Sequence, residues 1–240
     1  MKRRSFALIA LATLFAVPLP AADEAPPTVD QILNKYLQAA GGKEAIEKIT
    51  TRVMKGEIDV VTFSTKGPFE RITKEPDLQV TTSEFEGFGK VIQCYDGHTA
   101  WVSEPERGMR EITGPERDLM RRQADLHGPL HLKSQYKSIV AKGKSKIGER
   151  DAWLLECQPE EGSVEKLYFD VESGLLTGLE VQTPQNTAMK VLLEDYKAVD
   201  GIMLPFTIRQ ESPELSLVVR TSEVTHNVPV DDAKFAKPSK

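Results

Sequence analysis

Hydrophobic and polar side chains alternate along much of this chain. Between residues 54 and 60, Met54, Ile58 and Val60 alternate with charged side chains, which is the pattern of a β-strand with one buried face. Similar runs follow, separated by turn residues. We expect strands over residues 54–60, 69–74, 78–85, 88–95, 99–102, 109–112, 138–147, 152–158, 167–169, 175–181, 190–199, 205–210 and 215–224.

Two consecutive β-hairpins are predicted between Lys166 and Arg209. The second turns at Asp200-Gly201, a dipeptide that readily takes the positive φ angles of a type I′ turn. Roughly a dozen strands with turns every ten or so residues are typical of an antiparallel meander. The predicted fold class is mainly β: a single-domain open antiparallel β-barrel or strongly curved sheet with a few covering α-helices.

A strongly amphipathic helix is predicted before the first strand. Thr28 and Gln31 have the spacing of a capping box, and Gly41-Gly42 ends the helix. One apolar stripe runs along it through Val29, Ile32, Leu33, Tyr36, Leu37 and Ala40. Such a stripe must be buried, most naturally against the concave face of the sheet.

Two further helices are expected, a short one over residues 43–49 and a third from Pro115 to Leu126. The third begins with proline and carries Glu116 and Asp118 near the positive end of its dipole. Its apolar side chains are few: Leu119, Met120, Ala124 and Leu126. We therefore expect this helix to be only lightly attached to the sheet.

The first residues resemble an export signal. Lys2-Arg3-Arg4 precede the apolar run Phe6–Val17, which is too short to span a bilayer as a helix. We expect a signal peptide over residues 1–21, cleaved after Ala21 or Ala22, and a periplasmic or secreted protein; the alternative is an uncleaved anchor. The remaining divisions are a Pro-rich leader (22–27), the β-barrel domain (28–235) and a frayed tail (236–240).

Composition narrows the choice of partners. The formal net charge is −5, with 40% hydrophobic and 28% charged residues, as in an ordinary globular protein. Losing the three basic residues of the leader makes the chain more acidic, and no basic cluster remains. This argues against binding to nucleic acid or to anionic membrane surfaces. We expect a monomer without a cofactor.

No catalytic constellation stands out. His127 and His131 have a metal-like spacing, but Gly128-Pro129 interrupts the helix that such ligation needs. No serine lies in a Gly-x-Ser-x-Gly motif, and the carboxylates at Glu84 and Glu86 are best interpreted as solvated charges. The sequence predicts no enzyme and no metal site.

Cys94 and Cys157 are the only cysteines, and both fall inside predicted strands. In an oxidising compartment an even pair favours a disulfide, whereas two buried strand thiols are the alternative. Since the chain lacks a Cys-x-x-Cys motif, redox catalysis is disfavoured.

Several segments together resemble the LolA/LolB-like periplasmic lipoprotein-localisation superfamily, including secreted proteins labelled outer membrane lipoprotein-sorting proteins. They are residues 28–42, Phe169-Asp170 with Gly174-Leu175, residues 194–196 and residues 199–205. The resemblance implies an open antiparallel β-barrel whose helices close one side over an apolar cavity. It also implies a shuttle for acylated lipoproteins or lipids, with a role in outer membrane biogenesis and transport.

Two functions are therefore open. The first is a periplasmic carrier or receptor that binds the acyl chains of lipids or lipoproteins between the curved sheet and the helices. The second is a non-enzymatic module that binds other envelope proteins and has an ordinary packed core. For the carrier, we predict that apolar side chains on the first four strands face the cavity and that two on the third helix cover it. These are Met54, Ile58, Val60, Ile72, Val80 and Ile92, with Leu119 and Met120.

Overall fold

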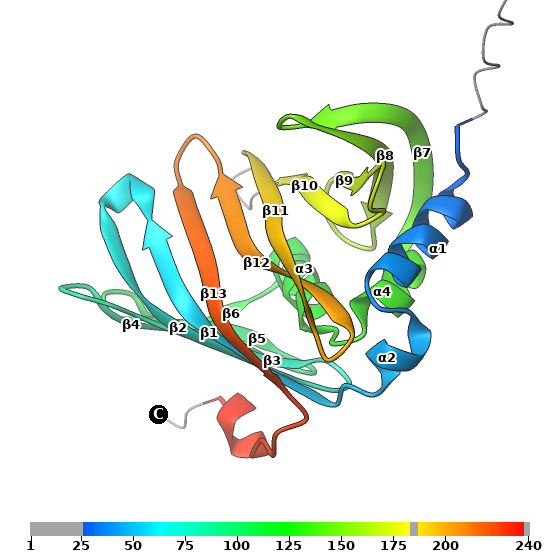
Figure 1. Cartoon of the computed structure of the whole chain (residues 1–240). Coiled ribbons are helices and arrows are strands. Elements are labelled where there is room, and N and C mark those ends of the chain that lie inside the picture. The colour runs from blue at the N-terminus through cyan, green and yellow to red at the C-terminus, as the bar shows by residue number, and fades with distance from the viewer. Residues whose placement is uncertain (1–25, 183–186, 238–240) are drawn as a thin grey trace, which may run out of the picture.

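A single antiparallel sheet dominates the computed structural model, which describes residues 26–182 and 187–237 (Figure 1). Its thirteen strands lie in the order β6-β5-β4-β3-β2-β1-β13-β12-β11-β10-β9-β8-β7. The strands are β1 (Thr51–Val60), β2 (Thr65–Lys74), β3 (Leu78–Phe85), β4 (Gly89–Asp96), β5 (Ala100–Glu104), β6 (Gly108–Ile112), β7 (Tyr136–Ile147), β8 (Arg150–Pro159), β9 (Glu165–Asp170), β10 (Leu176–Gln182), β11 (Ala188–Val199), β12 (Ile202–Glu211) and β13 (Ser216–His226).

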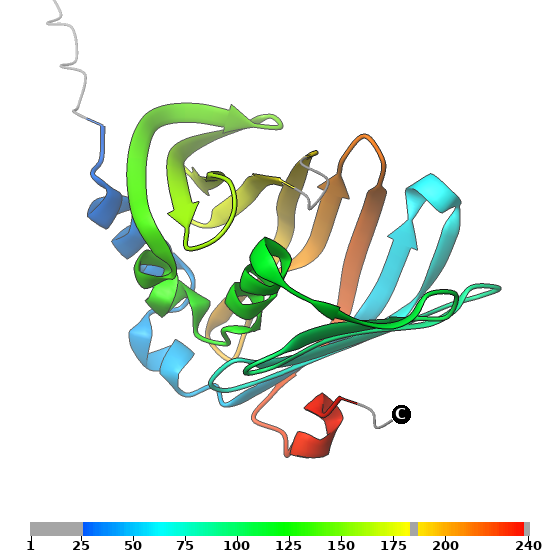
Figure 2. The same ribbon diagram turned by 180° about the vertical axis from the view of Figure 1, so that it is seen from behind.

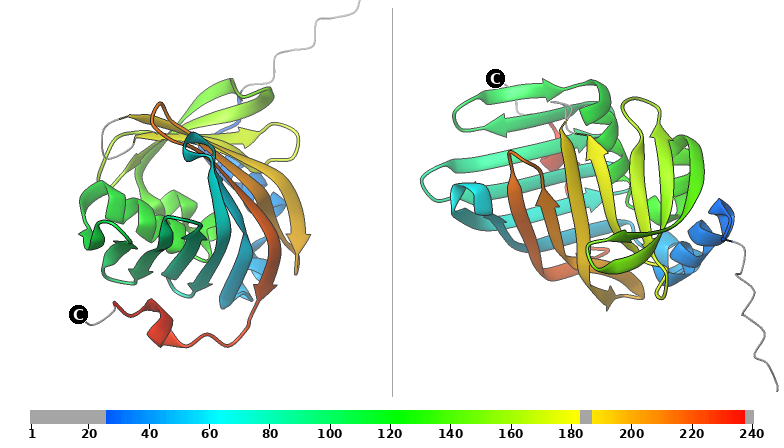
Figure 3. Two further views of the ribbon diagram at one scale, coloured as in Figure 1. Left: turned by 90° about the vertical axis from the view of Figure 1, so that its left-hand side faces the viewer. Right: turned by 90° about the horizontal axis from the view of Figure 1, so that it is seen from above.

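The sheet curves strongly but does not close, so β6 and β7 remain its two edges (Figure 3). Strands that are neighbours in sequence pair with each other, except β6 and β7, and β1 also pairs with β13 in the middle of the sheet. The first and last strands of the domain thus join its two halves. The predicted mainly-β fold class, an open curved sheet with a few helices, is confirmed.

The second predicted hairpin is present. Asp200 and Gly201 connect β11 to β12 with φ angles of 50° and 81°, the left-handed backbone that a type I′ turn requires. A β-bulge between Lys55 and Gly56 shifts the register of β1 against β13. Such bulges increase the local bend of a strand, and this one lies at the centre of the curved sheet.

The helices lie before the first strand and between the two edge strands. They are α1 (Val29–Ala39), α2 (Lys43–Glu47), α3 (Gly114–Ala124) and α4 (Gly128–His131). Short 3-10 turns are η1 (Val61–Phe63), η2 (Leu132–Gln135) and η3 (Asp232–Phe235). None of the helices among the described residues is both long and apolar enough to cross a membrane.

Helix α1 forms as its pattern predicts. The Thr28 hydroxyl accepts a hydrogen bond from the Gln31 amide at 3.3 Å, and the Gln31 side chain accepts one from the Thr28 amide at 2.8 Å. Ile32 is buried against Leu155 and Phe169 of β8 and β9. The ring of Tyr36 packs edge-on against that of Phe169, with centroids 5.2 Å apart.

The two faces of the sheet have different covers. Helix α3 packs Met120 and Ala124 against Tyr95 and Val102, on the face that we call inner because α3 lies within the curve of the sheet (Figure 2). The C-terminal turn η3 packs Phe235 on the opposite, outer face of β2–β5, below the sheet in Figure 1. The molecule therefore has core on both sides of these strands.

The cysteines are not paired. Cys94 and Cys157 are both free and buried. The Cys94 thiol lies in the outer cluster, 3.2 Å from the carbonyl oxygen of Phe235, whereas Cys157 lies under α1 in the inner cluster of β8 and β9. The predicted disulfide is wrong because the two predicted strands, β4 and β8, belong to opposite halves of the sheet.

The predicted signal peptide lies outside the described residues, as do the first residues of the Pro-rich leader and the last three of the tail. The segment from the cap of α1 to the end of η3 spans residues 28–235, and its assignment as one domain stays a prediction.

Candidate functional site

The candidate site is the inner face of the sheet together with the helices that cover it. On β1 this face carries Met54, Ile58 and Val60, because Val53 packs in the outer cluster and successive side chains alternate. All three are partly exposed. They are therefore placed where a ligand on the inner face would lie, and their contact with a ligand stays a prediction.

Ile72, Val80 and Ile92 do not face this side. They pack with Trp101 and Phe235 in the outer cluster. The prediction that they line the cavity is wrong: η3 covers them on the outer face, and the inner face of β3 carries Gln79, Thr81 and Ser83 instead. The strand pattern showed which residues share a face, but it did not show that η3 covers the outer face.

Helix α3 is attached differently from the prediction. Met120 packs against the β4–β6 cluster, but Leu119 joins none of the hydrophobic clusters among the described residues. The buried side chains on α3 are Asp118, Arg122 and Ala124. Two of these three are charged, so most of the attachment is polar.

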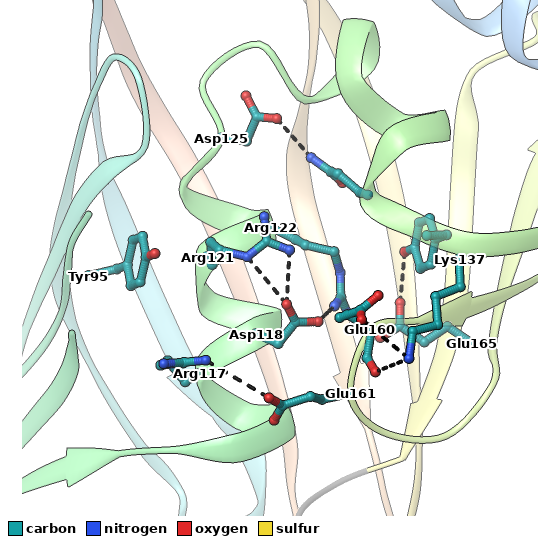
Figure 4. A network of polar contacts seen from close by, with 12 residues as sticks. Tyr95, Arg117, Asp118, Arg121, Arg122, Asp125, Lys137, Glu160, Glu161 and Glu165 are labelled. Carbon is teal, nitrogen blue, oxygen red and sulfur yellow. Dashed lines mark hydrogen bonds and ion pairs between the residues drawn. The ribbon is translucent and has the colours of Figure 1, made fainter. Parts of the chain in front are cut away.

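A cluster of charges connects α3 to the opposite half of the sheet (Figure 4). Arg122 forms ion pairs with Asp118 one turn earlier on the helix and with Glu165 of β9. The Tyr136 hydroxyl donates to the other oxygen of Glu165 at 2.8 Å, and Arg121 pairs with Asp118 at 2.9 Å. We call Asp118, Arg122, Tyr136 and Glu165 the clamp.

Burial governs the electrostatics of the clamp. Burial raises the pKa of Glu165, while Arg122 and the hydrogen bond from Tyr136 act in the opposite direction. Burial and the neighbouring Glu165 raise the pKa of Tyr136 well above its ordinary value. The guanidinium of Arg122 also lies over the Tyr136 ring, 5.3 Å from its centroid. A buried cation with two carboxylates and an aromatic face is a strong, directional attachment.

The clamp was missed by sequence reasoning. Asp118 and Arg122 have the i, i+4 spacing of a helical ion pair, but most such pairs are on the surface and contribute little. The signal that distinguishes this pair is Glu165, which lies 43 residues further along the chain.

A cavity of about 200 Å³ lies between the helices and the sheet. Its wall is mainly apolar, with Arg52 and Asp125 as its charged members. The lining residues are Tyr36, Ala40, Ile46, Arg52, Asp125, Leu126, Pro129, Leu176, Leu193, Tyr196, Ile202, Met203, Leu204 and Pro205. The volume is below the usual range for small-molecule pockets, about 300–1,000 Å³.

Arg52 is held in this wall by a chain of hydrogen bonds. Its Nε donates to Nε2 of His226 at 3.0 Å, and Nδ1 of His226 lies 2.9 Å from a carboxylate oxygen of Asp200. Burial lowers the pKa of Arg52 to about 10 and raises that of Tyr36 to about 12. Burial, with Arg52 adding to it, also lowers the pKa of His226, so this imidazole is neutral at pH 7.

A second arginine lies on the same face of the neighbouring strand. Arg71 of β2 is opposite Met54 of β1, and its Nε donates to the Thr81 hydroxyl at 3.1 Å. Burial lowers its pKa, and no ion pair joins it to a carboxylate of the described residues. The inner wall of β1 and β2 thus carries two largely buried cations, Arg52 and Arg71.

A wider hollow of about 760 Å³ lies at the turns of the β7–β8 and β9–β10 hairpins. Charged side chains border it, among them Lys144, Arg150, Asp151 and Asp170. Such a lining does not suit an acyl chain. The smaller cavity between the helices and the sheet is the better candidate.

The histidines make ordinary contacts. His127 bonds through Nε2 to the Ile49 carbonyl at 2.8 Å, and His131 to Asp125 at 2.9 Å. Within the described residues, no group of three or more His, Cys, Asp or Glu side chains could hold a metal ion.

Known structures share this architecture. A DUF1329 family protein from Desulfovibrio piger matches 87% of this chain and 97% of its own length, with a TM-score of 0.61 at 14% identity. A LolA superfamily protein from Nitrosomonas europaea matches 88% of this chain and 98% of its own length, with a TM-score of 0.60 at 14% identity. A Vibrio parahaemolyticus domain assigned to the outer membrane lipoprotein-sorting proteins matches 85% of this chain and 97% of its own length, with a TM-score of 0.55 at 13% identity.

These likenesses define the class of protein by its fold. The chain has the LolA-like fold, as the resemblance in its sequence implied. At identities of 13–14% they establish the fold alone. No protein-family model matches the chain, and no curated protein sequence does.

Proposed function

We propose that the chain is a periplasmic or secreted carrier or receptor that binds the acyl chains of lipids or lipoproteins on the inner face of its sheet. The observation that carries this proposal is the cover: α3 lies on an apolar wall but is fastened mainly by the buried clamp. When the clamp opens, α3 leaves as a unit with little loss of apolar contact. The segment that follows α3 lines the cavity of about 200 Å³ with Asp125 and Leu126, so release of α3 would let this cavity enlarge.

Two further observations support the proposal. Met54, Ile58 and Val60 offer a line of partly exposed apolar side chains along β1. The LolA-like fold is shared with a domain assigned to lipoprotein sorting. The basic and apolar leader supports export.

A fluorescent fatty-acyl probe tests the proposal. We expect the wild type to bind it, and Ile58→Glu to weaken binding at least tenfold because a buried charge would face the chain. Val140→Glu is the matched control, since Val140 is 53% exposed on the outer face of β7 and should leave binding unchanged. A wild type that binds no probe would contradict the carrier.

One observation favours the alternative of a protein-interaction module. Three hairpin tips at one end of the sheet carry exposed apolar side chains: Val61 and Phe63 between β1 and β2, at 50% and 69%, Phe88 between β3 and β4, at 43%, and Met109 just after the β5–β6 turn. A module of this kind would bind an envelope protein through these tips. It would lose that partner on Phe63→Ser, whereas Ile58→Glu would have no effect on it.

A further inference from the structure

The 200 Å³ cavity between the helices and the sheet contains polar groups that are only partly satisfied by the described residues. Arg52 and Tyr36 both line it and lie close enough for the charge of Arg52 to affect the Tyr36 hydroxyl. Arg52 donates only through Nε, to His226, and the Tyr36 hydroxyl makes no hydrogen bond with any described residue. The two terminal nitrogens of Arg52 are therefore available to a ligand.

The orientation of Arg52 is fixed from behind. His226 accepts from Nε, and Asp200 holds the other ring nitrogen of His226. With Nε occupied, the guanidinium can turn only its terminal nitrogens toward another group. Its pKa of about 10 keeps it protonated at neutral pH, although burial opposes the charge.

Among the described residues, no carboxylate forms an ion pair with this cation. Asp125 also lines the cavity, but its oxygens accept from Gln135 at 2.8 Å and contact His131 at 2.9 Å. A buried cation without an anion is unfavourable, so a ligand that brings a negative charge stabilises the site.

Apolar side chains lead away from Arg52 on the same face. Met54, Ile58 and Val60 follow it along β1, and eight residues of strand span about 26 Å. The ring of Phe69 fills the place that Gly56 leaves on this line. An extended hydrocarbon chain can therefore lie on this apolar surface from Arg52 toward the β1–β2 turn.

We propose that this cavity binds the anionic end of an acyl ligand, a carboxylate or phosphate, on Arg52 and Tyr36, with its chain along β1. The inference rests on the proposed acyl carrier and adds the chemistry of the head group. It makes the ligand an acidic amphiphile instead of a neutral lipid. The hydrogen-bond chain from Asp200 through His226 positions the guanidinium.

The test compares head groups on one chain. Oleate, oleoyl lysophosphatidic acid and methyl oleate are titrated separately, below their aggregation concentrations, against a bound neutral acyl probe. We expect at least one of the two acids to bind about tenfold tighter than the ester, the usual size of a charge-assisted hydrogen bond. The more strongly bound acid identifies carboxylate or phosphate as the preferred head group.

Variants then locate the effect. Arg52→Met should abolish the preference for acid over ester while ester binding persists, and Tyr36→Phe should reduce it. Arg71→Met is the matched control, because Arg71 is an inner-face arginine outside the cavity lining and its loss should leave the preference intact. Circular dichroism checks that each variant is folded; if Arg52→Met is not, Tyr36→Phe and the wild-type comparison decide.

Each other result has a definite meaning. Equal binding of acids and ester by the wild type overturns the head-group site but leaves the carrier standing. A preference for acid over ester that is lost in Arg71→Met and retained in Arg52→Met also overturns the head-group site and leaves the carrier standing. If none of the three compounds displaces or binds, the proposed carrier function itself fails, and the head-group site fails with it.

Discussion

The two cysteines show how a residue's surroundings determine its chemistry. Burial is the main cause that raises the pKa of each thiol to about 12. Since the thiolate is the reactive form, neither cysteine should react in the folded protein, and both should remain free in an oxidising compartment.

Ellman's reagent checks this at pH 8. We expect no measurable reaction of the native protein within minutes and reaction of two thiols per chain in denaturant without reductant, because unfolding exposes both and restores an ordinary pKa. Cys157→Ala should leave one thiol. A denatured wild type with no reactive thiol would show that Cys94 and Cys157 are paired after all.

Residue patterns predicted strands better than they predicted faces. The alternation in β1 correctly grouped Met54, Ile58 and Val60 on one face. For Ile72, Val80 and Ile92 the grouping was also right, but the face was not. Alternation shows which residues of a strand share a face, but not which face of the sheet is inner. For these strands the outer face is the one on which η3 packs.

At the scale of elements, the contrast between α1 and α3 is the main finding. Helix α1 was predictable because its cap and its apolar stripe are both local in sequence. The attachment of α3 was not, because Glu165 and Tyr136 come from β9 and β7. The helix expected to be lightly held by apolar contacts is held by buried charges instead.

Removing the cation tests the clamp. Arg122→Met should lower the free energy of unfolding by about 3–5 kcal/mol, because Asp118 and Glu165 would lose the buried cation that they share. It should also increase amide hydrogen exchange in α3. Urea denaturation measures the free energy of unfolding, and mass spectrometry measures the hydrogen exchange of α3.

Arg117→Met is the matched control on the same helix. Arg117 is 46% exposed, and its nitrogen Nη2 lies as far as 4.0 Å from the carboxylate oxygen of Glu161. The loss of this exposed, long ion pair should change stability by less than about 1 kcal/mol. Equal effects of the two substitutions would contradict the clamp.

At the scale of the whole molecule, the C-terminal segment completes the outer core. After β13 the chain leaves the sheet, and η3 places Phe235 against Ile72 and Trp101. Phe235 is 2% exposed. The part of the chain expected to fray thus begins only after this residue.

Phe235→Ala should therefore be costly. We expect a loss of about 3–5 kcal/mol in the free energy of unfolding, as for other buried phenylalanines, together with faster labelling of Cys94 at its edge of the core. Phe63→Ala is the control, since Phe63 is 69% exposed and should change stability little. Unchanged stability in Phe235→Ala would mean that η3 is not docked in solution.

The fold as a whole followed from local signals, since a meander pairs neighbours in sequence. The pairing of β1 with β13 could not be predicted from local signals, because those strands are more than 150 residues apart. That long-range pairing brings Arg52 next to His226. No motif near either residue indicates the contact.

The clamp has a consequence for how α3 can move. A helix held by apolar contacts can slide over an apolar surface and keep most of its buried area, because hydrophobic contacts are non-directional. The pair of Arg122 with Asp118 moves with the helix, but Arg122 cannot shift by a turn without losing Glu165 and the Tyr136 ring on the other half of the sheet. Helix α3 therefore has only two states, seated or released, and in a carrier it would act as a latch that is either shut or open.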